Sequence, residues 1–174
     1  MKKALFVGRF QPFHMGHLMT VKRILKSHDS VIIMVGSANE SGTPENPFSA
    51  EERIDMIKLT MEYENIRNFE ITSLEDFHDD EMWSRVIMSA VKFDSVYTNN
   101  PWTARCFRKK GIKVNRYGFY HKRKYSGREI RKRIMQGDDW KSLVPPAVYG
   151  QLKRIKGDER IRKLGSPDPV LSCP

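Results

Sequence analysis

Residues 3–35 read KALFVGRFQPFHMGHLMTVKRILKSHDSVIIMV. The apolar run at residues 3–7 and the β-branched run at residues 30–35 are typical of strands buried in a parallel sheet. Between them, apolar side chains recur at three-and-four spacing over residues 16–27, which predicts an amphipathic helix facing a core. Residues 3–35 therefore predict a strand, helix, strand unit.

The following residues continue this alternation. Ser49 and Glu52 stand three residues apart and predict a capping box at the start of a helix that runs to about residue 63. Patterns further on predict a strand at residues 69–72, a helix at residues 81–91 and a strand at residues 95–98. Pro101 is expected to open a helix toward residue 110, and Val114 to lie in a fifth strand.

The C-terminal third adds more helices. Ser126 and Glu129 predict a second capping box, for a helix that ends at Gly137, and residues 146–164 predict one or two terminal helices. We expect an α/β fold: a Rossmann-like, doubly wound parallel sheet with helices on both faces. Residues 1–164 are expected to form one domain, and the proline-containing residues 165–174 a flexible tail.

Composition narrows the class of protein. With 174 residues, 39% hydrophobic and 30% charged, the chain has the profile of a globular domain. No apolar run approaches the roughly 18 residues that span a bilayer, and no signal peptide is evident, so a cytoplasmic protein is expected. Cys106 and Cys173 lie far apart and indicate neither a disulfide framework nor a zinc site.

The chain is strongly basic, with a formal net charge of +10 at pH 7. Such a charge favours an anionic partner, which could be nucleic acid, an acidic membrane or a phosphorylated small molecule. Basic residues crowd between Arg105 and Arg133, where aromatic residues alternate with them: Tyr117, Phe119, Tyr120 and Tyr125. This segment fits an RNA-binding surface or a solvated basic face, and composition does not choose between them.

The loop at residues 8–17 carries the strongest chemical signal, because it joins a parallel strand to a helix at the edge of the sheet where ligands bind. Gly8 permits close approach of the backbone, and Gly16 would admit a phosphate to the first turn of the helix. His14 and His17 stand three residues apart and are expected to share one face. The loop therefore predicts a phosphate-handling site, although two such histidines would also suit a metal ion with a third ligand from elsewhere.

These residues resemble a known family. The run Gly8-Arg9-Phe10-Gln11-Pro12-Phe13-His14-Met15-Gly16-His17 is similar to the signature of nucleotidyltransferases with a His-x-Gly-His motif. Its long form is similar to that of the archaeal-type nicotinamide-nucleotide adenylyltransferases. The resemblance extends to about residue 164 through five further matches in order: Gly36-Ser37-Ala38, Glu45-Asn46-Pro47-Phe48, Trp83, Asn100-Pro101 and Tyr125-Ser126-Gly127 with Glu129-Ile130-Arg131.

The resemblance implies an enzyme that joins ATP to nicotinamide mononucleotide, by direct in-line attack on the α-phosphate, to give NAD and pyrophosphate. It implies catalytic roles for Arg9, His14, His17 and Arg131, and further ATP contacts from Gly8, Phe10, Gly16, Asn100 and Ser126. Ser37, Asn39, Phe48 and Trp83 would bind the nicotinamide nucleotide, with Trp83 stacking on the ring. Mg²⁺ would be bridged by phosphates and not held by protein side chains.

Three positions depart from the family pattern. Arg128 stands where threonine is usual, so a phosphate contact there would come from a guanidinium in place of a hydroxyl. Glu52 replaces a common glycine, and Asn39 replaces a usual glutamine near the expected nicotinamide amide. Arg53 is left open between a phosphate contact and a solvent-exposed position.

The family resemblance also implies a homo-oligomer, with neither nucleic acid nor membrane as a partner. Nicotinate mononucleotide stays open as a second substrate, because it differs only in one carboxylate. Three further hypotheses stay open: an enzyme of the same fold that adenylylates or cytidylylates another phosphate ester, a regulator that binds NAD without making it, and an RNA-binding module. The RNA-binding module would show steep salt dependence and would have no need of His14 and His17 together.

Overall fold

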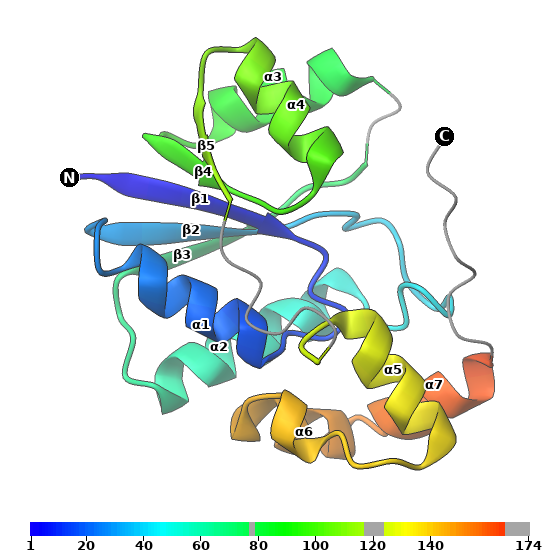
Figure 1. Ribbon diagram of the computed structural model, residues 1–174. Coiled ribbons are helices and arrows are strands. Elements are labelled where there is room, and N and C mark those ends of the chain that lie inside the picture. The colour runs from blue at the N-terminus through cyan, green and yellow to red at the C-terminus, as the bar shows by residue number, and fades with distance from the viewer. Residues whose placement is uncertain (77–78, 117–123, 166–174) are drawn as a thin grey trace.

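The structure is a computed structural model that describes residues 1–76, 79–116 and 124–165 (Figure 1). Its sheet has five strands: β1 (Lys3–Gly8), β2 (Ser30–Val35), β3 (Phe69–Ser73), β4 (Ser95–Tyr97) and β5 (Lys113–Asn115). The strands are ordered β3-β2-β1-β4-β5, and every neighbouring pair is parallel. The predicted parallel sheet is confirmed, as is the strand that contains Val114.

Helices cover both faces of the sheet. On one face lie α1 (Met15–Ile24), α2 (Ala50–Tyr63), α5 (Gly127–Gln136), α6 (Pro146–Arg154) and α7 (Gly157–Leu164), and on the other lie α3 (Asp80–Ala90) and α4 (Pro101–Lys109) (Figure 1). A short 3₁₀ helix at Lys141–Leu143 precedes α6. Because side chains alternate along a strand, β1 sends Phe6 to the larger core and Leu5 to the smaller one. The doubly wound fold is therefore confirmed.

The strand order places a ligand site. The chain leaves β1 for α1 on one face and leaves β4 for α4 on the other, so the two connections part between these neighbouring strands. In open parallel sheets, ligands bind in the crevice outside the carboxyl ends of the strands at such a point. The residues that follow Gly8 and Tyr97 lie at this edge.

The helix starts follow the local signals closely. Ser49 and Glu52 form the predicted capping box, and α2 ends at Tyr63 as expected. Ser126 caps α5, but Glu129 pairs with Arg133 at 2.8 Å, so the second predicted box forms only its Ser126 half. α1 runs from Met15 to Ile24, so it starts one residue earlier and ends three residues earlier than expected.

Several expectations lie outside the described residues. They concern Tyr117, Phe119 and Tyr120 of the basic segment, Cys173, and all of the proposed tail except Gly165. Within the described part of the chain, no helix is both long and apolar enough to cross a membrane.

Candidate active site

The N-terminus of α1 is closed by two histidines that cap each other. His14 is the N-cap, and its Nδ1 accepts a hydrogen bond from the His17 backbone N–H at 3.3 Å. In return, the His14 backbone N–H donates to Nδ1 of His17, also at 3.3 Å. The two rings stack with centroids 3.5 Å apart and an interplanar angle of 17°. The shared face expected for these histidines is therefore observed, with His14 as the cap.

This arrangement determines what the histidines can donate. A neutral imidazole that accepts at Nδ1 carries its proton on Nε2, so each ring has an Nε2–H donor. Burial lowers the pKa of His14 to about 3, although a backbone hydrogen bond opposes the shift. Burial, followed by repulsion from His14, also holds the pKa of His17 well below 6.5. Both rings are therefore neutral hydrogen-bond donors at pH 7.

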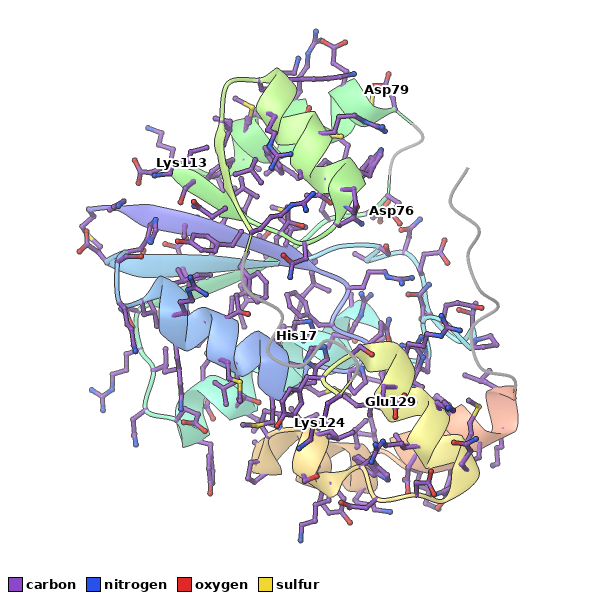
Figure 2. The ribbon with its side chains drawn as sticks, in the orientation of Figure 1. His17, Asp76, Asp79, Lys113, Lys124 and Glu129 are labelled. Carbon is purple, nitrogen blue, oxygen red and sulfur yellow. The ribbon has the colours of Figure 1, made fainter. Side chains whose placement is uncertain are left out.

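The N-terminus of α5 lies against this loop. A Cβ on Gly16 would come within 3.1 Å of the Tyr125 Cβ, and one on Gly127 would meet the Gln11 carbonyl oxygen at 2.6 Å. A side chain at position 127 would clash with backbone at this distance, and one at position 16 would push Tyr125 away, so the glycines let the two segments approach closely. Figure 2 shows His17 at the start of α1 beside α5, which carries Glu129. Two helix N-termini, each favourable to anions, therefore lie next to each other.

Arginines surround these helix ends. Arg131 of α5 is only 5% exposed, and its Nη1 donates to the Gln11 carbonyl at 2.7 Å. The side chain of Arg9 is exposed and lies 3.5 Å from Asn46 Oδ1. The first turn of α1 contains no acidic residue, so nothing there offsets the positive end of the helix. Neutral N–H donors and cations in this arrangement suit a polyphosphate.

On the β2 side the predicted residues are spread over a short segment. Ser37 is 7% exposed and has a positive φ of 49°. Asn39 is exposed, and its Oδ1 accepts from the Asp76 backbone N–H at 3.1 Å, which links the segments after β2 and β3. Phe48 is 0% exposed in the larger core, so its contact with the nicotinamide nucleotide stays a prediction that the described structure does not support.

Two further aromatic residues of the predicted site are also buried. Phe10 is 1% exposed, with its ring 4.8 Å from that of His17, so it supports the histidine pair from the core side. Trp83 is 3% exposed and packs against Trp102 at 4.8 Å and Phe107 at 5.6 Å. Stacking of Trp83 on a nicotinamide ring stays a prediction, because the described contacts of this ring are with the protein.

Asn100 begins the helix that follows β4. Its Oδ1 caps α4 by accepting from the Trp102 and Thr103 backbone N–H groups at 2.9 and 3.3 Å. Asn100 follows β4 by three residues, at the end of the strand that pairs with β1. A role for Asn100 near adenine therefore stays a prediction, supported by its place at this edge of the sheet.

Two residues hold the site together through contacts that the sequence does not indicate. The Gln11 side chain makes two hydrogen bonds to the Phe48 main chain: its Nε2 donates to the Phe48 carbonyl at 2.9 Å, and its Oε1 accepts from the Phe48 N–H at 3.0 Å. Arg53, expected to face either phosphate or solvent, does neither: it is 0% exposed and donates to main-chain carbonyls. No spacing signal marks such contacts, because they depend on segments that meet only in the folded chain.

The described residues contain no cluster of three or more His, Cys, Asp or Glu side chains that could hold a metal ion. The third ligand that a His14–His17 metal site would need is therefore not present in the described part of the chain. The donors at the helix ends are N–H groups and cations, which bind anions and not metal ions.

Comparison with known proteins defines the class first. The cytidylyltransferase-like family matches residues 5–133, and the chain belongs to this family. The chain is also 44% identical to the nicotinamide-nucleotide adenylyltransferase of Methanolobus tindarius over 169 residues, or 97% of each chain. The enzyme of the same name from Thermoplasma volcanium is 42% identical over 95% of this chain and 94% of its own length. Within the class, the chain is a member of the archaeal-type nicotinamide-nucleotide adenylyltransferase family.

Solved structures confirm the fold. A bifunctional NMN adenylyltransferase/ADP ribose pyrophosphatase from Francisella tularensis, complexed with AMP and a Mn ion, superimposes with a TM-score of 0.79 at 23% identity. The match covers 94% of this chain, which spans about half (51%) of that bifunctional protein. A putative nicotinate-nucleotide adenylyltransferase from Vibrio parahaemolyticus superimposes with a TM-score of 0.67 at 17% identity.

Proposed function

We propose that the protein transfers the adenylyl group of ATP to nicotinamide mononucleotide, with NAD and pyrophosphate as products. The full-length similarity to enzymes of that name supports this reaction. The observation that carries it in the structure is the meeting of two helix N-termini around neutral histidines and arginines. That set of donors matches a triphosphate and does not resemble a general acid–base pair.

The reaction needs no nucleophile from the protein. A 5′-phosphate oxygen of nicotinamide mononucleotide attacks the α-phosphorus of ATP, and the bond from that phosphorus to the bridging oxygen of pyrophosphate breaks in line. Catalysis of this kind consists mainly of alignment and charge neutralisation. His14 and His17 contact the phosphates, and the Nε2–H of His17 stabilises the charge that develops on the α-phosphate.

The triphosphate is held from two directions. Arg9 reaches it from the β1 loop and Arg131 from α5, where the N–H groups after Ser126 add a second set of donors. The main chain at Gly8 and Gly16 lets the phosphates approach. Phe10 packs against the His17 ring from the core side and keeps it in place. Asn100 lies on the adenine side of the site.

The nicotinamide nucleotide occupies the β2 side of the same edge. Ser37 and Asn39 contact it there. Phe48 and Trp83 are buried, so a contact from Phe48 and stacking of Trp83 on the nicotinamide ring both require a change in packing. Asn39 is exposed and stands where the family usually has glutamine, so it bears on the contacts around the nicotinamide amide. Nicotinate mononucleotide, which differs by one carboxylate, stays open as a second substrate.

A Mg²⁺ ion accompanies the ATP. The donors described above are cations and N–H groups, so phosphate oxygens and water would supply its coordination. When bound, Mg²⁺ would supply positive charge that favours departure of pyrophosphate. Mg²⁺ with few protein ligands fits this chemistry, and other divalent ions that accept octahedral oxygen ligands would replace it in part.

We further propose that the enzyme works in the cytoplasm as a homo-oligomer, as the family resemblance implies. Light scattering on the purified protein tests the assembly, and a mass of one 20.3 kDa chain would contradict it. The net charge of +10 attracts the anionic substrates, and we propose no nucleic acid as a partner.

The decisive experiment offers purified protein ATP, Mg²⁺ and one acceptor at a time. The acceptors are nicotinamide mononucleotide, nicotinate mononucleotide, phosphopantetheine and flavin mononucleotide, and both pyrophosphate and the dinucleotide are measured. NAD formation with the first acceptor confirms the reaction. Release of pyrophosphate with only phosphopantetheine or flavin mononucleotide would show that the acceptor is not nicotinamide mononucleotide. Binding of NAD without release of pyrophosphate would favour a regulator that binds NAD without making it.

A further inference from the structure

Arg53 is a fully buried cation whose described hydrogen bonds all go to main-chain oxygens. Its Nε donates to the Ser49 carbonyl at 3.0 Å, and its Nη1 to the carbonyls of Arg9 at 3.0 Å and Gly36 at 2.8 Å. Its Nη2 donates to the Ser37 carbonyl at 3.0 Å. Burial, followed by the nearby charge of Arg9, lowers the pKa of Arg53 to about 10, so it remains charged at pH 7.

The carbonyls of Arg9, Gly36 and Ser37 lie where β1 and β2 separate. The two strands pair up to Gly8 and Val35, and the last bond between them runs from the Gly36 N–H to the Gly8 carbonyl at 3.0 Å. Beyond this point the two described strands form no ladder that would satisfy the carbonyls of the diverging chains. The guanidinium of Arg53 bonds to both chains and takes the place of that ladder.

The same two chain segments contain strained backbone. Phe10 follows the carbonyl of Arg9 and has a φ of 52°, and Ser37 has a φ of 49°. Non-glycine residues in this conformation cost about 1–3 kcal/mol each and persist only where the surroundings hold them. Arg53 holds the peptide on the N-terminal side of Phe10 and the carbonyl of Ser37, which are the groups that set these two turns.

We propose that Arg53 is a positioning residue for adenylyl transfer, which fixes the backbone at Arg9 and at Gly36–Ser37 and thereby aims the Arg9 side chain at the triphosphate. This inference rests on the proposed function. Arg53 is 0% exposed, so it acts through the main chain of Arg9 and not by touching a substrate. A planar fork with donors on three nitrogens is needed for this task, because the acceptors belong to separate segments.

The first test replaces Arg53 by lysine, which keeps the charge but supplies a single ammonium group. We expect kcat for NAD formation, expressed per folded molecule, to fall about 10-fold to 100-fold, because small misplacements of aligned groups have costs of this size. KM for ATP should change less than kcat. A kcat within about threefold of wild type would reduce Arg53 to a purely structural residue and overturn the proposal.

Met61→Ala is the control for stability. Met61 is fully buried in the same helix but contacts neither loop in the described hydrogen bonds, so its truncation weakens the core without moving the Arg9 peptide. Kinetics of both variants are measured at a temperature where circular dichroism shows complete folding. We expect a wild-type kcat for Met61→Ala, and a loss like that of Arg53→Lys would show that destabilisation alone explains the effect.

A double-mutant cycle tests the route of the effect. If Arg53 acts through Arg9, the Arg53→Lys substitution should change kcat much less in an Arg9→Ala background than in the wild type. The double variant should then resemble Arg9→Ala alone within about threefold. Losses that multiply would mean that Arg53 acts independently of Arg9, which contradicts the proposal.

Hydrogen exchange supplies a readout without substrate. Arg53→Lys should raise amide exchange in residues 9–17 and 36–39 but leave β1 and β2 protected. Unchanged exchange in both segments would overturn the proposal whatever the kinetics show. Wild-type protein that forms no NAD would refute the proposed function instead, and the exchange result would still decide whether Arg53 fixes these two segments.

Discussion

The N-termini of α1 and α2 are closed in the same way by different chemistry. In α2, Ser49 and Glu52 form a reciprocal capping box, and two acidic residues lie in the first turn. In α1, His14 and His17 form the same reciprocal pair with no acidic residue in the first turn. The α2 box therefore neutralises the positive end of its helix, whereas the α1 box leaves that end available to an anion.

The partners of the two boxes reinforce this difference. Glu52 is bound at 2.6 and 2.7 Å by Arg160 of α7, so the α2 cap also joins two helices of the core. The loop of the His14–His17 box instead lies against the N-terminus of α5, whose Arg131 donates to the Gln11 carbonyl. Of these two helices, the one whose cap lacks acidic residues begins at the candidate site, and the one whose cap has them is joined to another helix of the core.

The largest expected effect follows from replacing His17, the third residue of α1. His17→Ala should lower kcat for NAD formation about 100-fold to 1,000-fold, because loss of one preorganised donor typically costs roughly 2.7–4 kcal/mol of transition-state stabilisation. The free energy of unfolding of this variant, measured in urea, should stay within about 1 kcal/mol of the wild-type value, as expected for the loss of one capping hydrogen bond. A near-normal kcat would remove His17 from the catalytic groups.

The next effect concerns the second helix N-terminus at the site. Arg131→Ala should raise KM for ATP about 10-fold to 100-fold, because hydrogen bonds to charged groups contribute about 1.5–3 kcal/mol. KM for nicotinamide mononucleotide should rise much less. Steady-state kinetics with each substrate varied in turn measure both, and unchanged ATP kinetics would exclude Arg131 from the triphosphate site.

The two boxes should also respond to acid at different pH. The pKa of His14 is lowered by burial from 6.5 to about 3, so the unfolded chain binds a proton that the folded chain does not. The free energy of unfolding should therefore fall as the pH drops through 6.5, at a rate that approaches about 1.4 kcal/mol per pH unit well below that value. Measured by urea unfolding, the free energy of unfolding should fall less from pH 7 to pH 5 in His14→Gln than in the wild type, by about 2 kcal/mol in total.

The α2 box loses its contribution later. Burial opposes ionisation of Glu52, but hydrogen bonds from Arg160 and Ser49 outweigh it and lower the pKa below 4.5. A group of this kind contributes stability above its unfolded pKa and loses it only as the pH falls through the folded pKa.

The His14→Gln comparison decides whether the histidine cap is buried. If the free energy of unfolding depends on pH in the same way in wild type and His14→Gln above pH 5, the histidine cap is not buried in solution.

The comparison also shows which parts of the structure can be predicted from sequence. Ser49 with Glu52, Ser126, and Asn100 with Pro101 set helix starts through contacts within a few residues, and the sequence predicts all these starts within one residue. The β-branched run at Ser30–Val35 likewise encodes its own strand. Local signals of this kind need no knowledge of the rest of the chain.

The candidate site is predictable only in part. The His-x-Gly-His segment and its place after a strand identify the histidines, but their stacked, mutually capped geometry depends on the backbone conformation at His14. The pairing of Gln11 with Phe48 joins residues 37 positions apart, and Arg53 bonds to residues 44 and 17 positions away. Such contacts have no period or spacing, because folding alone brings the partners together.

The smallest expected effect belongs to the α2 box. Glu52→Ala should lower the free energy of unfolding by about 1 kcal/mol, because it removes one half of the box and the partner of Arg160. Glu52→Gln, which keeps the cap bond but loses the charge, should cost less. Both variants should keep the wild-type kcat, because no described contact links Glu52 to the histidine pair. If Glu52→Ala lowered kcat as His17→Ala is expected to do, the division between a structural and a functional cap would be wrong.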